Sequence, residues 1–515
     1  MKKVVALLLA TLMLLGTLAV AFAEEEKTYK DTIVYAVGSD QNTLDAAMNT
    51  SNQLILSQVY GTLFKKDAEG NLYGDLATSW EIGEDQLSIA FTLREGVVFH
   101  NGKAFTANDV KATYDRILAD PDSFTNSAVF ANVTEVEVVD DLHVTLHLSK
   151  PDGSLMSNLA AIACAYIMDG DYIAQYENGV LGTTPETTNG TGPYKLAYWE
   201  MNEEMRLEAN ENYYGDIPLT KNVVIKIVTD QASRAIAVET GEVDIAAAVS
   251  PADFTRLQGT EGLNCISTLG NGMTLFYFNC ARGICVDTNV RLAIHHAVDI
   301  DTLVESLYGG LGEKPCYSTV APNSIGYKDN GRIPYDPELA TQMFEEAGVL
   351  GETIKILTTP LYNQGVQCAE VIAQYLREAG MNAEVTIVED AVFTETVIAN
   401  PASENPYDLY ICGAGAAALD ADETRLGYAD PTSVDSHNAY NNPRVSELLN
   451  ATTETMDQDE RQKLFEEAIH IMFIEDPACL WINQRNNVYI TTDKVEDFSS
   501  SQIGVVDFSH IRVAE

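Results

Sequence analysis

The stretch FTLREGVVFHNGK, residues 91–103, is the most informative part of this chain about its fold. Its first residues end a run at positions 86–93 that has the pattern of an antiparallel strand. Gly96 and Gly102 follow, and glycine provides backbone conformations that other residues avoid. The stretch therefore predicts a strand followed by a turn, and we assign these glycines a structural role rather than a ligand contact.

Further segments on both sides of this stretch follow in a defined order. They are LATSWE at 76–81, GTGPY at 190–194, Arg234 with GEVD at 241–244, Asn279 with VRLAI at 290–294 and VD at 298–299, YDP at 335–337 continuing to AG at 347–348, and AYNNP at 439–443. With residues 91–103, this order and spacing resemble the extracellular solute-binding proteins of the oligopeptide, dipeptide and nickel ABC importers, solute-binding protein family 5. The resemblance extends from about Thr32 to near the C-terminus.

Local patterns independently indicate an α/β protein. Thr106 and Asp109 form a capping box, which predicts the start of a helix. Residues 354–357, 366–379 and 385–388 have the pattern of a strand–helix–strand unit with parallel strands. A mature chain of about 490 residues also needs more than one domain, because single cores rarely exceed about 250–300 residues.

The family resemblance implies an α/β, two-lobed periplasmic-binding-protein-like fold of type II with an extra inserted domain, in which a hinge closes the lobes around a ligand. We expect the hinge near residues 279–285 and 489–494. The expected division is 1–23 signal peptide, 24–64 first part of lobe I, 65–189 inserted domain, 190–285 second part of lobe I, 286–489 lobe II, and 490–515 C-terminal part of lobe I.

The N-terminus has the pattern of a secretory signal peptide. Lys2 and Lys3 precede an apolar run at residues 4–20, and an Ala-Phe-Ala motif ending at Ala23 provides the small residues of a cleavage site. We expect cleavage after Ala23 and an extracytoplasmic protein, periplasmic or secreted into the cell envelope. The first cysteine is Cys164, so we expect no lipid anchor on an N-terminal cysteine.

Composition and motifs argue against chemistry and against nucleic-acid binding. The formal charge of −45 repels nucleic acid. The sequence contains no zinc-protease, serine-hydrolase, P-loop or dinucleotide-binding motif. His295 and His296 are adjacent on a predicted helix, so they point about 100° apart and do not suit a shared ion. We expect no catalytic residue, no cofactor, no metal site and a monomer; how the eight cysteines pair stays open.

The candidate ligand residues come from the family resemblance. In peptide-binding members an aspartate after a strand and a glycine-rich turn pairs with the ligand amine, and the matching stretch here is residues 407–422. Asp420 is the first candidate for this role and Asp422 the second, since a carboxylate binds an ammonium group strongly where water is excluded. The other expected contacts are Gly413, Ala414, Thr50, Ser51, Asn52, Thr274 and Tyr277, with Tyr277 facing either ligand or core. An arginine for a ligand carboxylate stays open among Arg282, Arg332 and Arg425.

These features predict the extracytoplasmic substrate-binding component of an ABC importer. We expect it to bind di- or oligopeptides in a cleft between the lobes and to deliver them to the membrane permease. One alternative keeps the receptor role with another cargo, such as a nickel chelate, a sugar or another metabolite, because the fold does not dictate the ligand. A more distant alternative is a secreted hydrolase on a similar scaffold, whose site would be recognised by geometry rather than by motif.

Overall fold

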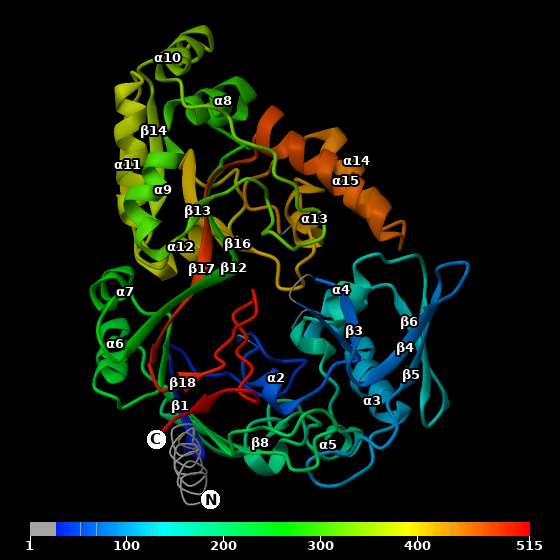
Figure 1. Cartoon of the computed structure of the whole chain (residues 1–515). Coiled ribbons are helices and arrows are strands. Elements are labelled where there is room, and N and C mark those ends of the chain that lie inside the picture. The colour runs from blue at the N-terminus through cyan, green and yellow to red at the C-terminus, as the bar shows by residue number, and fades with distance from the viewer. Residues whose placement is uncertain (1–26, 52, 68–69, 126, 434) are drawn as a thin grey trace, which may run out of the picture.

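The computed structural model describes residues 27–51, 53–67, 70–125, 127–433 and 435–515. The described part is an α/β fold of two lobes with a smaller body at one side (Figure 1). The expected signal peptide and Asn52 lie outside the described residues. Within the described ranges, no helix is both long and apolar enough to cross a membrane.

One sheet of eleven strands continues through both lobes. In sheet order its strands are β15 (Asn382–Ile387), β14 (Thr353–Thr358), β16 (Leu409–Gly415), β12 (Leu263–Phe278), β17 (Cys479–Thr492), β11 (Ile245–Ala247), β1 (Thr32–Val37), β10 (Asn222–Ile227), β9 (Glu204–Ala209) and β8 (Tyr194–Glu200), and β13 (Lys314–Pro315) pairs with β17 off this path. β14 and β15 are parallel and are joined by a helix, which confirms the predicted strand–helix–strand unit.

Helices pack on this sheet in both lobes (Figure 1). Those of the upper lobe are α8 (Thr288–Ala297), α9 (Ile300–Tyr308), α10 (Pro337–Glu346), α11 (Gly365–Glu378), α12 (Asp390–Thr394), α13 (Asp422–Tyr428), α14 (Pro443–Ala451) and α15 (Gln458–His470). The lower lobe contains α2 (Leu56–Val59), α6 (Gln231–Glu239), α7 (Pro251–Leu257) and the strand pair β18 (Val495–Glu496) and β19 (Arg512–Val513). Seven cysteines, namely Cys265, Cys280, Cys285, Cys316, Cys368, Cys412 and Cys479, are free thiols, and six of the eight cysteines of the chain are buried.

The smaller body has its own antiparallel sheet and its own core. Its elements are β2 (Phe64–Lys66), β3 (Leu72–Gly74), β4 (Ala77–Ile82), β5 (Ser88–Leu93), α3 (Ala107–Ala119), β6 (Val133–Asp140), β7 (His143–Leu148) and α4 (Leu155–Leu159), and α5 (Gly170–Gln175) follows on the way back to the lower lobe. Thr106 and Asp109 form the predicted capping box at the start of α3. Gly96 and Gly102 have φ of 79° and 87°, which confirms their structural role in the turns after β5.

Two long antiparallel strands join the lobes. β12 has 16 residues and β17 has 14. Near Thr491, β17 also pairs with β11 of the lower lobe, whereas the last residues of β12 pair with β16 of the upper lobe. The register between β12 and β17 shifts from Leu269 to Met273, so that residues 270–272 lie opposite Arg485 alone. Such irregularities bend a strand pair, and we propose that the lobes hinge at this point.

The packing favours a hinge inside these strands over the positions expected near residues 279–285 and 489–494. Phe278 and Cys285 are buried in the same core as residues of α8, α11 and β14, although the expected boundary placed them in lobe I. Tyr489, expected to end lobe II, is buried in the core of the lower lobe. The remaining boundaries of the expected division stay a proposal.

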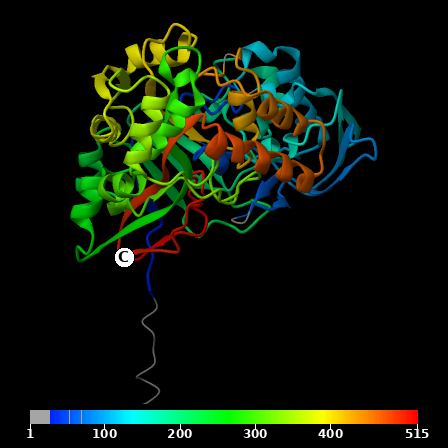
Figure 2. The same ribbon diagram turned by 90° about the horizontal axis from the view of Figure 1, so that it is seen from above.

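The upper lobe touches the inserted body directly. The backbone amide of Met456 donates to Oε1 of Gln86 at 2.8 Å, and Nε2 of Gln458 donates to the carbonyl of Gly153 at 3.2 Å. Ala418 and Met456 are buried within the hydrophobic core of the inserted body. Figure 2, seen from above, shows α14 and α15 beside this body. The upper lobe is therefore closed against the inserted body.

Gly153 lies so close to the upper lobe that no side chain fits there. An added Cβ would lie 2.3 Å from both the Thr455 carbonyl oxygen and Cδ of Arg461. We expect Gly153→Ala to keep the lobes apart, which small-angle X-ray scattering detects as a larger radius of gyration. Gly427→Ala is the matched control, because the nearest atom to its added Cβ is the Asp435 carbonyl oxygen at 3.8 Å. A Gly153→Ala protein as compact as the control would contradict the closed contact.

Candidate ligand-binding site

Strand β16 has an open edge next to the closed interface. It pairs with β12 over its whole length, but with β14 only at Leu409 and Tyr410. From Ile411 to Gly415, no strand of the described part continues the sheet on that side. An unpaired edge presents backbone N–H and C=O groups that an extended chain can bind by strand addition. The expected contacts Gly413 and Ala414 lie on this edge and are partly exposed.

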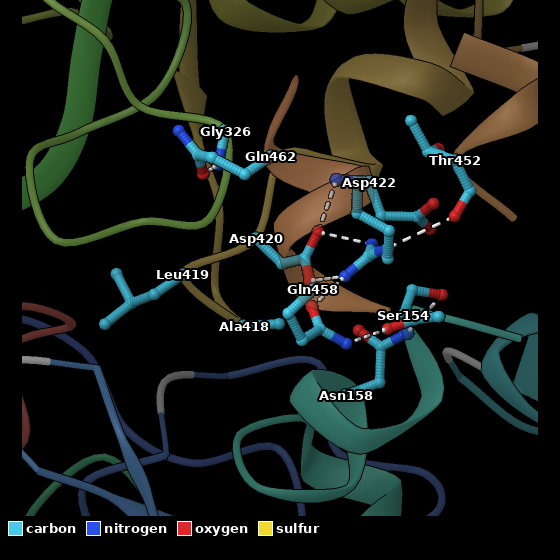
Figure 3. Close-up of polar contacts among 12 residues, drawn as sticks. Ser154, Asn158, Gly326, Ala418, Leu419, Asp420, Asp422, Thr452, Gln458 and Gln462 are labelled. Atoms are coloured by element: carbon cyan, nitrogen blue, oxygen red, sulfur yellow. Dashed lines mark hydrogen bonds and ion pairs between the residues drawn. The ribbon is translucent and has the colours of Figure 1, made fainter. Parts of the chain in front are cut away.

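Asp420, the expected amine anchor, is bound by an arginine of its own lobe. Its carboxylate is fully buried and pairs with Arg461 through two hydrogen bonds of 2.9 Å, with the Arg461 side chain buried equally deeply. Oδ1 of Asp420 also accepts from the backbone amide of Asp422 at 3.0 Å. Figure 3 shows these contacts next to Gln458 and Thr452, which accept further hydrogen bonds from Arg461.

This pairing differs from the expectation that Asp420 is available to a ligand. A ligand ammonium would have to displace a bidentate, buried guanidinium, which is among the stronger charge pairs in proteins. Asp422 is similarly engaged, since its carboxylate accepts from Nε of Arg425 at 2.7 Å and from Nη2 at 3.2 Å. The pairing partner was not predictable because Arg461 lies 41 residues away on a separate helix.

The segment before Asp420 binds the inserted body. Nζ of Lys66 donates to the Ala418 carbonyl at 2.5 Å and lies 3.5 Å from the Leu419 carbonyl oxygen. Burial lowers the pKa of Lys66 to about 8, and the Asp420 carboxylate opposes this decrease. The turn after β16 is therefore held from the other side of the interface, directly beside the open strand edge.

Thr274 and Tyr277 lie on β12, a central strand paired on both sides by β16 and β17. Thr274 is buried, and Tyr277 packs against Tyr410 and His437 with ring centroids 5.7 Å and 6.2 Å apart. Tyr277 therefore faces the core and not the ligand, which settles the two orientations that strand alternation had left open. We do not include these two residues in the proposed site.

Thr50 and Ser51 lie in a loop of the lower lobe that Asn42 holds. The Thr50 amide donates to Oδ1 of Asn42 at 3.0 Å, and the Ser51 hydroxyl donates to the same oxygen at 3.0 Å. Thr50 is exposed and Ser51 partly exposed. Their role as ligand contacts stays a proposal, and Asn52 lies outside the described residues.

The arginines considered for a ligand carboxylate are differently placed. Arg282 is exposed on the surface, Arg332 lies 3.7 Å from Asp301, and Arg425 is bound to Asp422. The structure instead places Arg485 at the crossing of the lobes, where Nη2 lies 3.2 Å from the position a Cβ of Gly413 would take. A sequence signal exists for it: NQRNN, residues 483–487, interrupts the otherwise mostly apolar strand β17.

Glu313, one residue before β13, is a buried carboxyl group at the same crossing. Its oxygens accept from Nδ2 of Asn483 at 2.5 Å and from the Asn486 amide at 3.2 Å. Burial raises the pKa of Glu313 to about 7, and these hydrogen bonds and the Arg485 charge only partly offset that effect. The crossing therefore contains a carboxyl group that titrates near neutral pH.

Two lobes that meet over an open strand edge form a clamp, the class of protein that holds a small solute between its halves. The family model for "Bacterial extracellular solute-binding proteins, family 5 Middle" matches residues 71–436, and the chain belongs to this family. The resemblance seen in the sequence is thereby confirmed.

Individual relatives agree with this membership. The chain is 26% identical over 501 residues to the glutathione-binding protein GsiB of Pectobacterium atrosepticum, covering 95% of this chain and 93% of the relative. The periplasmic binding protein DppA of Helicobacter pylori, solved with peptide STSA, aligns with a TM-score of 0.77, 23% identity and coverage of 96% and 100%. NikA of Brucella suis, solved with Fe(III)-EDTA, aligns with a TM-score of 0.82 and 23% identity, covering 94% of this chain and 99% of NikA.

The family places the chain among the substrate-binding proteins of ABC importers, which work outside the cytoplasm. The ligands named for these relatives differ from one another. The cargo of this chain must therefore be argued from its own site.

Replacing Asp420 tests whether its role is structural. Asp420→Ala leaves Arg461 as an uncompensated buried charge, which costs about 3–5 kcal/mol of unfolding free energy. We expect urea denaturation to show this loss, and the double variant Asp420→Ala/Arg461→Met to recover part of it. Asp420→Ala with normal stability but no ligand binding would instead make Asp420 the amine anchor.

The Glu313 carboxyl group makes stability depend on pH. Its pKa is 4.5 in the unfolded chain and about 7 in the folded protein, so ionisation disfavours the folded state. The penalty is absent below about pH 4.5, grows as the pH rises, and is complete above about pH 7, where it reaches about 3 kcal/mol. We expect Glu313→Gln to gain unfolding free energy relative to wild type between pH 5 and pH 8 in chemical denaturation. A difference independent of pH would contradict the raised pKa.

Proposed function

We propose that this protein is the extracytoplasmic receptor of an ABC importer for short peptides, exported by the N-terminal signal peptide. The observation that supports it is the stretch of β16 from Ile411 to Gly415, which no strand of the described part pairs on the β14 side and which is partly exposed from Gly413 to Gly415. The receptor delivers its cargo unchanged to the membrane permease.

Strand addition explains how such an edge selects a peptide. The main chain of an extended peptide forms the same hydrogen bonds as a neighbouring strand, whatever its side chains are. Gly413 and Gly415 lie in the partly exposed part of this edge, where a peptide main chain would bind in the plane of the sheet. The space on the sheet face over Gly413 is taken by Arg485 and Tyr362, each of which lies 3.2 Å from an added Cβ. Binding by backbone groups suits a receptor that accepts peptides of varied sequence, since waters can fill the space around different side chains.

Closure of the lobes provides the second half of the binding. Lys66 from the inserted body binds the turn after β16, and Gln86 and Gln458 bind across the same interface. A cargo that lies on β16 is then enclosed by the inserted body, and its hydrogen bonds strengthen because water is excluded. Transport requires only this closing and opening, with no bond of the cargo broken.

Glutathione is a specific candidate within the peptide class. Several curated relatives, covering 88% or more of this chain, are named glutathione-binding proteins. Glutathione is a tripeptide whose first linkage runs through the glutamate side chain, so it presents fewer regular backbone groups than an α-linked tripeptide. Comparing the binding of glutathione with that of an α-linked tripeptide therefore distinguishes strand addition from recognition of the end groups.

A thermal-shift panel tests the proposed function. It contains di-, tri- and tetra-alanine, glutathione, and the nickel–histidine complex and maltose as cargoes of other classes, with free alanine as the control. A ligand present at 100 times its dissociation constant adds about 2.7 kcal/mol, which raises the melting temperature by several degrees. We expect a shift with at least one peptide. Shifts with the nickel complex or maltose alone would overturn the peptide assignment while leaving the receptor role.

A further inference from the structure

Arg485 lies where the two lobes meet, on the strand that joins them. The register shift of β12 places residues 270–272 opposite it, and this irregularity aims its side chain across the sheet surface toward β16. It is partly exposed, while its Nε is buried. Arg485 therefore lies beside the open edge of β16 that the proposed function uses.

The guanidinium occupies space that two glycines leave free. A Cβ on Gly272 would lie 2.6 Å from Nη2 and 2.7 Å from Nε of Arg485, and one on Gly413 would lie 3.2 Å from Nη2. Gly272 belongs to β12 and Gly413 to the adjacent strand β16. Any other residue at position 272 would push the guanidinium away from its place.

Nothing in the described part of the chain binds this guanidinium. Arg485 makes no side-chain hydrogen bond and no ion pair there, and its buried Nε has no partner. The nearby Glu313 directs its oxygens to Asn483 and the Asn486 amide instead. A carboxylate is not the only partner that an enclosed arginine finds in this chain: the buried Arg234, for example, donates to four backbone carbonyls, whereas Arg485 has neither kind of partner. The other unbound arginine of the described ranges, Arg282, is exposed to solvent.

A partly enclosed, unpaired guanidinium is costly unless something compensates it. Its planar fork matches the two oxygens of a carboxylate, with which it forms paired, charge-assisted hydrogen bonds. We propose that Arg485, lying over Gly272 and Gly413, binds a carboxylate of the cargo. The cargo class is thereby narrowed to solutes that carry a carboxylate next to the segment bound by β16.

This inference rests on the proposed function for its peptide ligand, and the experiment separates the two. Calorimetry measures the affinities of tri-alanine, its C-terminal amide and Ala-Asp-Ala amide for the wild type, Arg485→Gln, Arg485→Lys and the control Arg282→Gln. Loss of one hydrogen-bonded charge pair corresponds to about a 10-fold to 100-fold weaker affinity. Relative to tri-alanine binding by the wild type, we expect this weaker affinity for tri-alanine amide binding by the wild type and for tri-alanine binding by Arg485→Gln.

The decisive result is that the effects of Arg485→Gln and of C-terminal amidation of the peptide on the binding affinity are not additive. Arg485→Gln should bind tri-alanine and its amide equally, Arg485→Lys should recover part of the affinity, and Arg282→Gln should equal wild type. Ala-Asp-Ala amide binding like free tri-alanine would identify a side-chain carboxylate as the partner rather than the C-terminus. Peptide binding that is unchanged in Arg485→Gln would overturn the inference while the peptide function stands.

If no peptide binds, the proposed function fails and Arg485 is tested with citrate and succinate, which carry carboxylates without a peptide backbone. A melting-temperature shift with either that is lost in Arg485→Gln supports the carboxylate site, and no such difference overturns it. The ligand-free protein gives a second readout. Arg485→Gln should unfold at the same or a higher temperature than wild type, whereas a clear decrease would show that Arg485 is a structural residue.

Discussion

The structure depends on the antiparallel pairing of β12 and β17, which are the strands that connect the two lobes. Backbone hydrogen bonds along their length keep the two lobes in one sheet, so the lobes cannot separate without breaking this pairing. The register shift between Leu269 and Met273 is the point where this ladder is interrupted. A bend confined to this point moves the upper lobe as a body, because the cores on either side remain intact.

The charges at the interface divide into two kinds. Asp420 and Arg461 satisfy each other and fix the turn after β16, so the strand edge keeps its shape whether or not a ligand is present. Arg485 lies on the other side of Gly413 without a carboxylate of its own. An enclosed guanidinium that no group in the described part of the chain binds suits the proposed carboxylate of the cargo. The same interface thus combines a completed ion pair that shapes the site and an incomplete one that the cargo is proposed to complete.

The sequence was sufficient for the family, the two-lobed α/β fold and the local elements, because these follow from ordered segments and short-range patterns. The capping box at Thr106, the turns at Gly96 and Gly102, and the parallel unit of β14 and β15 are of this kind. The pairing of Asp420 was missed because Arg461 is remote in sequence, and the sequence around a loop carboxylate does not show whether that carboxylate is free or paired. The hinge was expected near residues 279–285, after the end of β12, whereas we propose it at the register shift inside this strand, since a continuous strand gives no sign of which lobe each residue joins. The polar run at residues 483–487 in an apolar strand was the available signal for Arg485.

The most direct test of a clamp that closes on its cargo is hydrogen–deuterium exchange with and without a peptide that raises the melting temperature. The facing segments are residues 84–88, 151–155, 416–420 and 455–461, together with the β16 edge at 411–415. Slower exchange confined to these segments on peptide addition is the predicted result, because closure and strand addition both protect their amides. Bound peptide with unchanged exchange in these segments, and protection elsewhere, would contradict the clamp.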